Sequence, residues 1–177
     1  MRRLLDLVYD AAGYLAAFFV FAIFIVMLGT SVLRSVGIPT GGFEEIVGWL
    51  TAAAAFTGLA HTFKHGDLVR VELLIGRLPP ASRRAFEIVA LSVATLFVLY
   101  MTWSTIAYVS DSMRFGDMAG GMIAIPIWIP QSSFVVGTIL LSVAFVDELV
   151  RVIRGKTPSY VAAVEERHAR GDFSEDM

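Results

Sequence analysis

The chain has 177 residues, of which 56% are hydrophobic and 17% are charged, and its formal net charge is −2. Soluble domains carry about 25% charged residues, and the apolar excess here falls in long charge-free runs, which indicate segments whose solvent is lipid. The chain has no cysteine and no basic stretch with interleaved aromatic residues, which excludes disulfides and thiolate chemistry and argues against nucleic acid as a partner.

The first apolar run covers residues 11–33, between Asp10 and Arg34. Arg2 and Arg3 resemble the start of a signal peptide, but the run is longer than a typical signal-peptide core and lacks a clear cleavage site. As a helix it would reach roughly 35 Å, enough to cross a hydrocarbon core of about 30 Å. We therefore predict a retained transmembrane helix.

Three further apolar runs follow, at about residues 46–63, 88–110 and 128–146. The run 46–63 is the shortest and the richest in small residues, which permit close approach of another helix. Pro126 and Pro130 flank the start of the last run, so we expect its helix to begin between them. The sequence thus predicts an all-α integral membrane protein with four transmembrane helices.

Residues 68–78 place apolar side chains on one helical face and Arg70 and Arg77 on the other. This pattern predicts a short amphipathic helix in the membrane interface, with lipid or a partner subunit beneath it. An ordinary connecting helix packed on protein is the alternative. The membrane domain would then cover residues 1–154, and the polar stretch 155–177 would be a cytoplasmic tail.

Lysine and arginine are distributed unevenly among the connections. All of them except Arg34 and Arg114 lie before the first run, between the second and third, or after the fourth. Because cytoplasmic loops carry the excess of these residues, both termini are predicted to be cytoplasmic.

The centres of the four runs contain no ionisable residue. Such groups mark ion and substrate pathways, because each costs at least about 2.5–3.5 kcal/mol at the bilayer centre. The chain is therefore a poor candidate for carrying a transport site alone. No catalytic triad, phosphate loop or pair of catalytic carboxylates emerges, so we predict no catalytic residue and no enzyme activity.

His61 and His65 are four residues apart, on one helical face. Such a pair can bind a metal or haem, but haem between helices usually needs histidines on facing helices, and the remaining histidine, His168, is in the tail. We expect polar residues at a membrane boundary, with no metal and no cofactor. A membrane redox subunit with haem on His61 or His65 is the alternative function.

Charged residues lie near the predicted boundary of the membrane on the side opposite the termini. Glu44 and Glu45 precede the second run, where they would favour a helix N-terminus or contact a partner. Arg34 is a basic residue on the predicted outer side, where such residues are less common. Either it pairs with one of these acids, or its long side chain carries the charge to the membrane interface.

Two tryptophans, Trp49 and Trp128, lie near the same boundary and fit an aromatic belt, whereas Trp103 lies deeper and is expected to mark packing. Gly58 and its small neighbours would pack within the chain or dock a partner subunit.

Taken in order, short motifs resemble the small membrane subunit of tripartite ATP-independent periplasmic (TRAP) transporters, the DctQ-like family. They are Arg34, Phe43-Glu44-Glu45 with Trp49, the Gly-x-x-x-Arg-Val-acid-Leu-Leu stretch from Gly66 to Leu74, Leu78-Pro79-Pro80, and Ile125-Pro126-Ile127-Trp128-Ile129-Pro130-Gln131 with Gly137. The family often has histidine where this chain has Leu68, so no role of that histidine can be transferred.

The resemblance implies a non-catalytic scaffold subunit of a transporter driven by a sodium gradient, in the bacterial inner membrane. It implies a large membrane subunit that carries the ion and substrate sites and moves as an elevator. It also implies a periplasmic binding protein that delivers the substrate, typically an organic acid. The candidate partner-interface residues are Arg34, Glu44, Glu45, Trp49, Gly58, Arg70 and Trp128.

Overall fold

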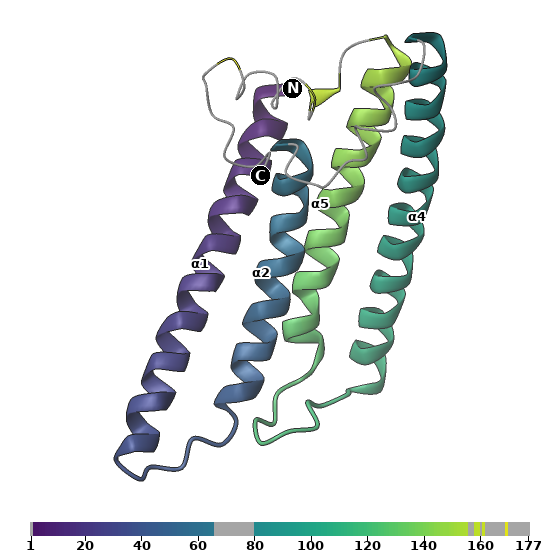
Figure 1. Cartoon of the computed structure of the whole chain (residues 1–177). Coiled ribbons are helices and arrows are strands. Elements are labelled where there is room, and N and C mark those ends of the chain that lie inside the picture. Colours follow the sequence, from purple (N-terminus) through teal and green to yellow (C-terminus); the bar gives the residue numbers. More distant parts are fainter. Residues whose placement is uncertain (1, 66–79, 156–157, 160, 162–168, 170–177) are drawn as a thin grey trace.

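The computed structural model describes residues 2–65, 80–155, 158, 159, 161 and 169. Nearly all of them belong to four helices, α1 (Arg2–Ser35), α2 (Phe43–His65), α4 (Pro80–Phe115) and α5 (Trp128–Ile153) (Figure 1). Each helix is long and apolar enough to cross a membrane, and the described residues contain no strand. The prediction of four membrane-spanning helices is therefore confirmed.

The helices extend beyond the apolar runs. Helix α5 begins at Trp128, between the two prolines as predicted, and continues past Val146 to Ile153. Asp10, Asp147 and Glu148, which bound these runs in the sequence, therefore lie inside helices. The amphipathic helix expected at 68–78, with Arg70, lies outside the described residues, as does most of the expected tail.

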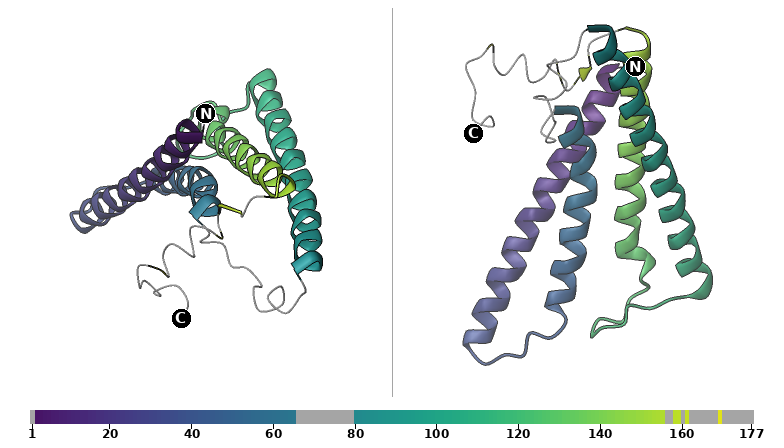
Figure 2. Two further views of the ribbon diagram at one scale, coloured as in Figure 1. Left: turned by 90° about the horizontal axis from the view of Figure 1, so that it is seen from above. Right: turned by 45° about the vertical axis from the view of Figure 1, so that its right-hand side comes forward.

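The four helices form an open row in the order α1, α2, α5, α4. Helix α1 packs on α2, α2 on α5, and α5 on α4, with only slight contacts between the other pairs. The right-hand view of Figure 2 shows α1 and α2 slanting away from α4 and α5, so the two pairs diverge with distance from the N-terminus. Each outer helix therefore has one extensive neighbour within the chain.

The two ends of the row differ in charge. One end collects the starts of α1 and α4 and the ends of α2 and α5 (Figure 1); we call it the basic end, because Lys64, Arg84, Arg151 and Arg154 lie there. The other end, the loop end, holds the connections 36–42 and 116–127, and its basic residues in the described chain are Arg34 and Arg114.

Small and hydroxyl residues hold the middle of the row together. A Cβ atom on Gly137 of α5 would lie 2.4 Å from the carbonyl oxygen of Phe56 in α2, so these two helices approach as closely as they do because residue 137 is glycine. Between α4 and α5, the Thr102 hydroxyl lies 3.0 Å from the Thr138 carbonyl oxygen and 2.8 Å from the Ser142 hydroxyl. Close approach at a glycine and hydrogen bonds between hydroxyl groups both suit a membrane. Lipid is as apolar as the side chains, so hydrophobicity alone does not drive helices together there.

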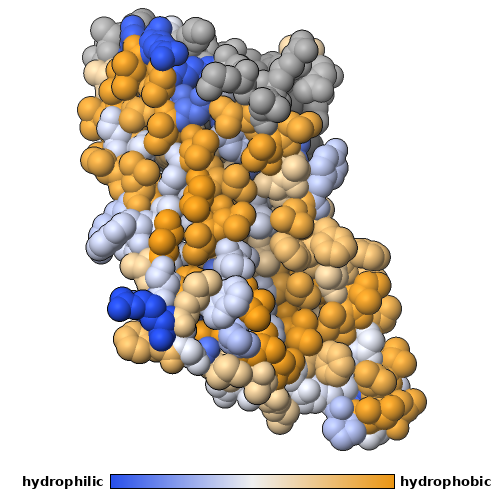
Figure 3. All heavy atoms as spheres, turned by 180° about the vertical axis from the view of Figure 1, so that it is seen from behind, coloured by the Kyte–Doolittle hydropathy of each residue, from blue (hydrophilic) through white to orange (hydrophobic). Residues whose placement is uncertain are grey.

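The outer helices expose large apolar side chains. The most apolar part of α1 contains no buried residue. On α4, Trp103 is 67% exposed and its ring lies beside that of Tyr100 on the same helix, so no other described helix buries it. Figure 3 shows hydrophobic side chains over the middle of one face and hydrophilic ones gathered toward the ends. This surface needs lipid or another protein to cover it.

Candidate partner interface and polar clusters

Arg34 and Glu44 form an exposed pair at the loop end. Arg34 Nη2 lies 3.5 Å from Glu44 Oε1 and 3.4 Å from the Thr40 hydroxyl. The two charged side chains are 66% and 85% exposed. Of the two acids that the sequence offered as partners for Arg34, the structure therefore selects Glu44.

Glu45 contacts the backbone of the connection between α4 and α5 and not Arg34. Its carboxylate accepts hydrogen bonds from the backbone N–H groups of Met122, at 2.6 Å, and Ile123, at 3.4 Å. A Cβ atom on Gly121 would lie 2.1 Å from the same carboxylate, so only glycine leaves room for this contact. Glu45 thus ties the connection between α4 and α5 to the first turn of α2, which the sequence analysis did not foresee.

The remaining candidate interface residues are dispersed. Trp128 is 36% exposed at the start of α5, and Trp49 is half-buried on α2. A Cβ atom on Gly58 would lie 3.5 Å from the Cβ atom of Ala16, so Gly58 packs against α1 within the chain. Arg70 lies outside the described residues. The loop end therefore brings together Arg34 and Glu44 but not the whole candidate set.

A buried ionic cluster joins α2 to α5 at the basic end. Lys64 Nζ lies 2.6 Å from Asp147 Oδ2 and 3.2 Å from Glu148 Oε2. The Lys64 side chain is 9% exposed and that of Glu148 is fully buried. Glu148 also accepts a hydrogen bond from the backbone N–H of Ser159, at 2.5 Å, and one from its hydroxyl. Sequence reasoning missed this cluster because it treated the two acids as the end of a span.

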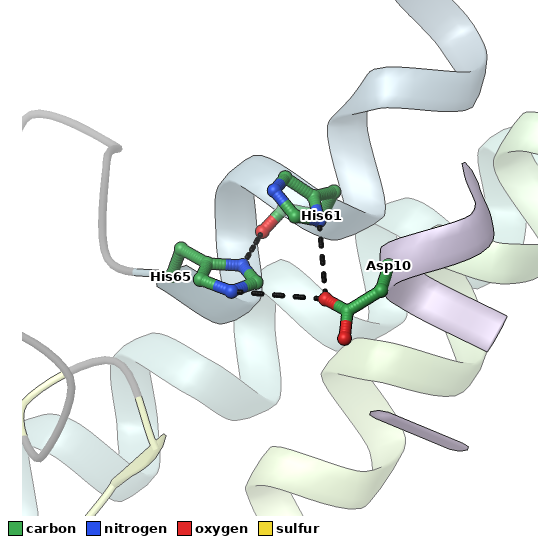
Figure 4. A group of neighbouring side chains, drawn as sticks. All are labelled: Asp10, His61 and His65. Carbon is green, nitrogen blue, oxygen red and sulfur yellow. Dashed lines mark hydrogen bonds and ion pairs between the residues drawn. The ribbon is translucent and has the colours of Figure 1, made fainter. Parts of the chain in front are cut away.

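A second polar cluster joins α1 to α2 nearby (Figure 4). Asp10 Oδ1 lies 3.7 Å from His61 Nδ1 and 3.9 Å from His65 Nε2. The two imidazole rings lie side by side, with centroids 4.0 Å apart. Such neighbours cannot serve as axial ligands on opposite faces of one haem. No other described residue is a histidine, so the haem alternative gains no support from the described part of the chain.

The chain matches one family of known proteins. Residues 23–155 fit the family model described as tripartite ATP-independent periplasmic transporters, DctQ component. The match begins within α1, includes all of α2, α4 and α5, and contains the Arg34–Glu44 pair and the Lys64 cluster. The comparison with curated proteins finds no match.

Proposed function

The chain belongs to the DctQ family of TRAP transporter components, and from this premise we propose that it is the non-catalytic scaffold subunit of such a transporter. Its proposed partner is a large membrane subunit that holds the ion and substrate sites and moves as an elevator. A periplasmic binding protein delivers the substrate. A sodium gradient drives the transport, and the substrate class is an organic acid; these details rest on the family resemblance.

The observation that carries the scaffold role is the absence of ionisable groups from the centres of the four helices. The stretches 11–33, 46–60, 88–110 and 128–146 contain no aspartate, glutamate, lysine, arginine or histidine. Transport sites inside membranes are commonly built from such groups or from broken helices. The four helices described here are continuous. These features favour a chain that supports transport over one that conducts it.

The open row supports the presence of a large membrane partner. A closed four-helix bundle turns its core positions inward, whereas this row leaves two broad faces and two outer helices exposed. Large apolar side chains on the outer helices are exposed, for example Phe21 at 60% and Phe97 at 65%. In the proposed complex the large subunit covers part of this surface and lipid covers the remainder, so the chain widens the stationary part of the transporter.

The charge distribution supports one orientation in the bacterial inner membrane. The basic end faces the cytoplasm, because basic residues favour that side. The loop end then faces the periplasm, where the Arg34–Glu44 pair and Trp128 are exposed to a binding protein. We propose that these residues form part of its docking surface.

Co-purification tests the proposal. The affinity-tagged chain is co-expressed with a large TRAP permease subunit from the same genome, extracted in mild detergent and analysed by size-exclusion chromatography. We expect the large subunit to elute with the chain in one peak at a fixed ratio. A chain that elutes alone as a stable, monodisperse species, with no large subunit retained, would overturn the scaffold role.

A further inference from the structure

Asp10, His61 and His65 are brought together from two helices, and we propose that they form a binding site for a divalent transition-metal ion of the Zn²⁺ class. One carboxylate oxygen and one nitrogen from each ring lie within 4.8 Å of one another. The sequence predicted polar residues at a membrane boundary here, and the two histidines by themselves supply only two ligands. The fold supplies a third ligand from α1. The proposal does not depend on the transport function proposed above.

The spacing of the three groups suits an ion between them. The distances from Asp10 Oδ1 to His61 Nδ1 and His65 Nε2, 3.7 and 3.9 Å, are too long for direct hydrogen bonds. Ligand atoms about 2.0–2.2 Å from a tetrahedral zinc ion are roughly 3.3–3.6 Å from one another. Small side-chain rotations would therefore bring the three groups to coordination distance.

Hydrogen bonding prepares His65 as a ligand. Its Nδ1 lies 3.0 Å from the carbonyl oxygen of His61 and donates its hydrogen there in the neutral ring, which leaves the lone pair on Nε2, the nitrogen that faces Asp10. Metal-binding histidines in proteins are usually fixed in this way through their second nitrogen. His61 Nδ1 lies 3.2 Å from the Tyr9 carbonyl oxygen, and metal binding through Nδ1 would replace that contact.

The helices position the site and leave it accessible. A Cβ atom on Gly13 would lie 2.7 Å from His61 Nδ1, so glycine at this position lets the imidazole lie against α1. The side chains of Asp10, His61 and His65 are 51%, 34% and 45% exposed, so an ion can enter and solvent can complete its coordination.

The ligand types indicate the class of ion. Two imidazole nitrogens and one carboxylate oxygen suit zinc and its first-row neighbours, whereas magnesium and calcium prefer oxygen ligands alone. Helix α1 packs extensively only on α2. An ion held by Asp10 and the two histidines would therefore stabilise the contact between α1 and α2.

Metal titration of the purified protein tests the proposal. The full-length chain, with its large subunit if they co-purify, carries an affinity tag without histidine and is titrated with Co²⁺, whose visible absorption reports nitrogen and oxygen coordination. Zn²⁺ is then added as a competitor. We expect one ion per chain and a rise in melting temperature with Zn²⁺, because an ion that binds only the folded state stabilises it.

Matched variants decide whether these residues hold the ion. Asp10→Asn and His65→Gln should each weaken binding by at least about tenfold, since losing even an outer-shell partner of a metal ligand costs 10–100-fold. The controls Asp6→Asn, one helical turn away on α1, and His168→Gln should bind as the unaltered chain does. The proposal would be overturned if the unaltered chain showed no absorption and no stabilisation, or if Asp10→Asn and His65→Gln bound the ion as tightly as the unaltered chain does.

Discussion

The two ends of the helix row use similar charged side chains in different surroundings. At the basic end Lys64 is 9% exposed and Glu148 is fully buried, whereas at the loop end Arg34 and Glu44 are 66% and 85% exposed. Removing one partner of a buried pair costs about 3–5 kcal/mol, but an exposed pair contributes about 0–1 kcal/mol. The comparison indicates that the basic end fixes the helices in place, while the loop end keeps its charges available to a partner.

Lys64→Met removes the cation of the buried ionic cluster at the basic end and should have the largest effect on stability. It leaves the buried Glu148 carboxyl group without its cationic partner, with only Ser159 among the described residues still donating hydrogen bonds to it. We expect a loss of about 3–5 kcal/mol in the free energy of unfolding, measured by denaturant titration of the purified protein in detergent.

A double variant separates the buried charge from the loss of packing. Lys64→Met combined with Glu148→Gln removes the unpaired charge, so it should recover part of the lost stability. The control Arg154→Met, at an exposed position of the same end, should change stability by no more than about 0.5 kcal/mol. A Lys64→Met variant as stable as the control would show that the basic end does not depend on this cluster.

Gly137→Ala tests the contact between α2 and α5 that lies between the two ends. The added Cβ atom would meet the Phe56 carbonyl oxygen at 2.4 Å, and a backbone atom in a helix cannot move aside easily. Overpacking of this kind typically costs about 1–3 kcal/mol. Gly48→Ala is the matched control, because a Cβ atom there would have no neighbour within 4 Å. Equal melting temperatures for the two variants would refute the close approach as a source of stability.

The sequence predicted the helices well because each apolar run is long and free of charge, and this property is local. The start of α5 followed from Pro126 and Pro130 for the same reason. The clusters were missed because they depend on which helices become neighbours. Asp10 faces His61 only once α1 packs on α2, and Lys64 meets Glu148 only once α2 packs on α5 and α5 continues past the apolar run. No periodicity within one segment carries that information.

The loop end should show the smallest effect on stability, even if its charges matter for transport. Arg34→Gln and Glu44→Gln each remove an exposed pair, so the free energy of unfolding should change by less than about 1 kcal/mol. If this pair helps to dock the binding protein, uptake by the assembled transporter should fall in both variants. The uptake of the unaltered transporter should also depend on ionic strength, since salt screens exposed charges.

Arg114→Gln is the control for those two variants, because Arg114 is the other exposed base at the loop end. Its uptake should match that of the unaltered transporter if docking requires the Arg34–Glu44 pair in particular. An equal loss in all three variants would mean that only the overall charge of this end matters. A large loss of stability in Arg34→Gln would instead make the pair structural, and the contrast between the two ends would no longer hold, because surface exposure would then have failed to predict which ion pair the fold depends on.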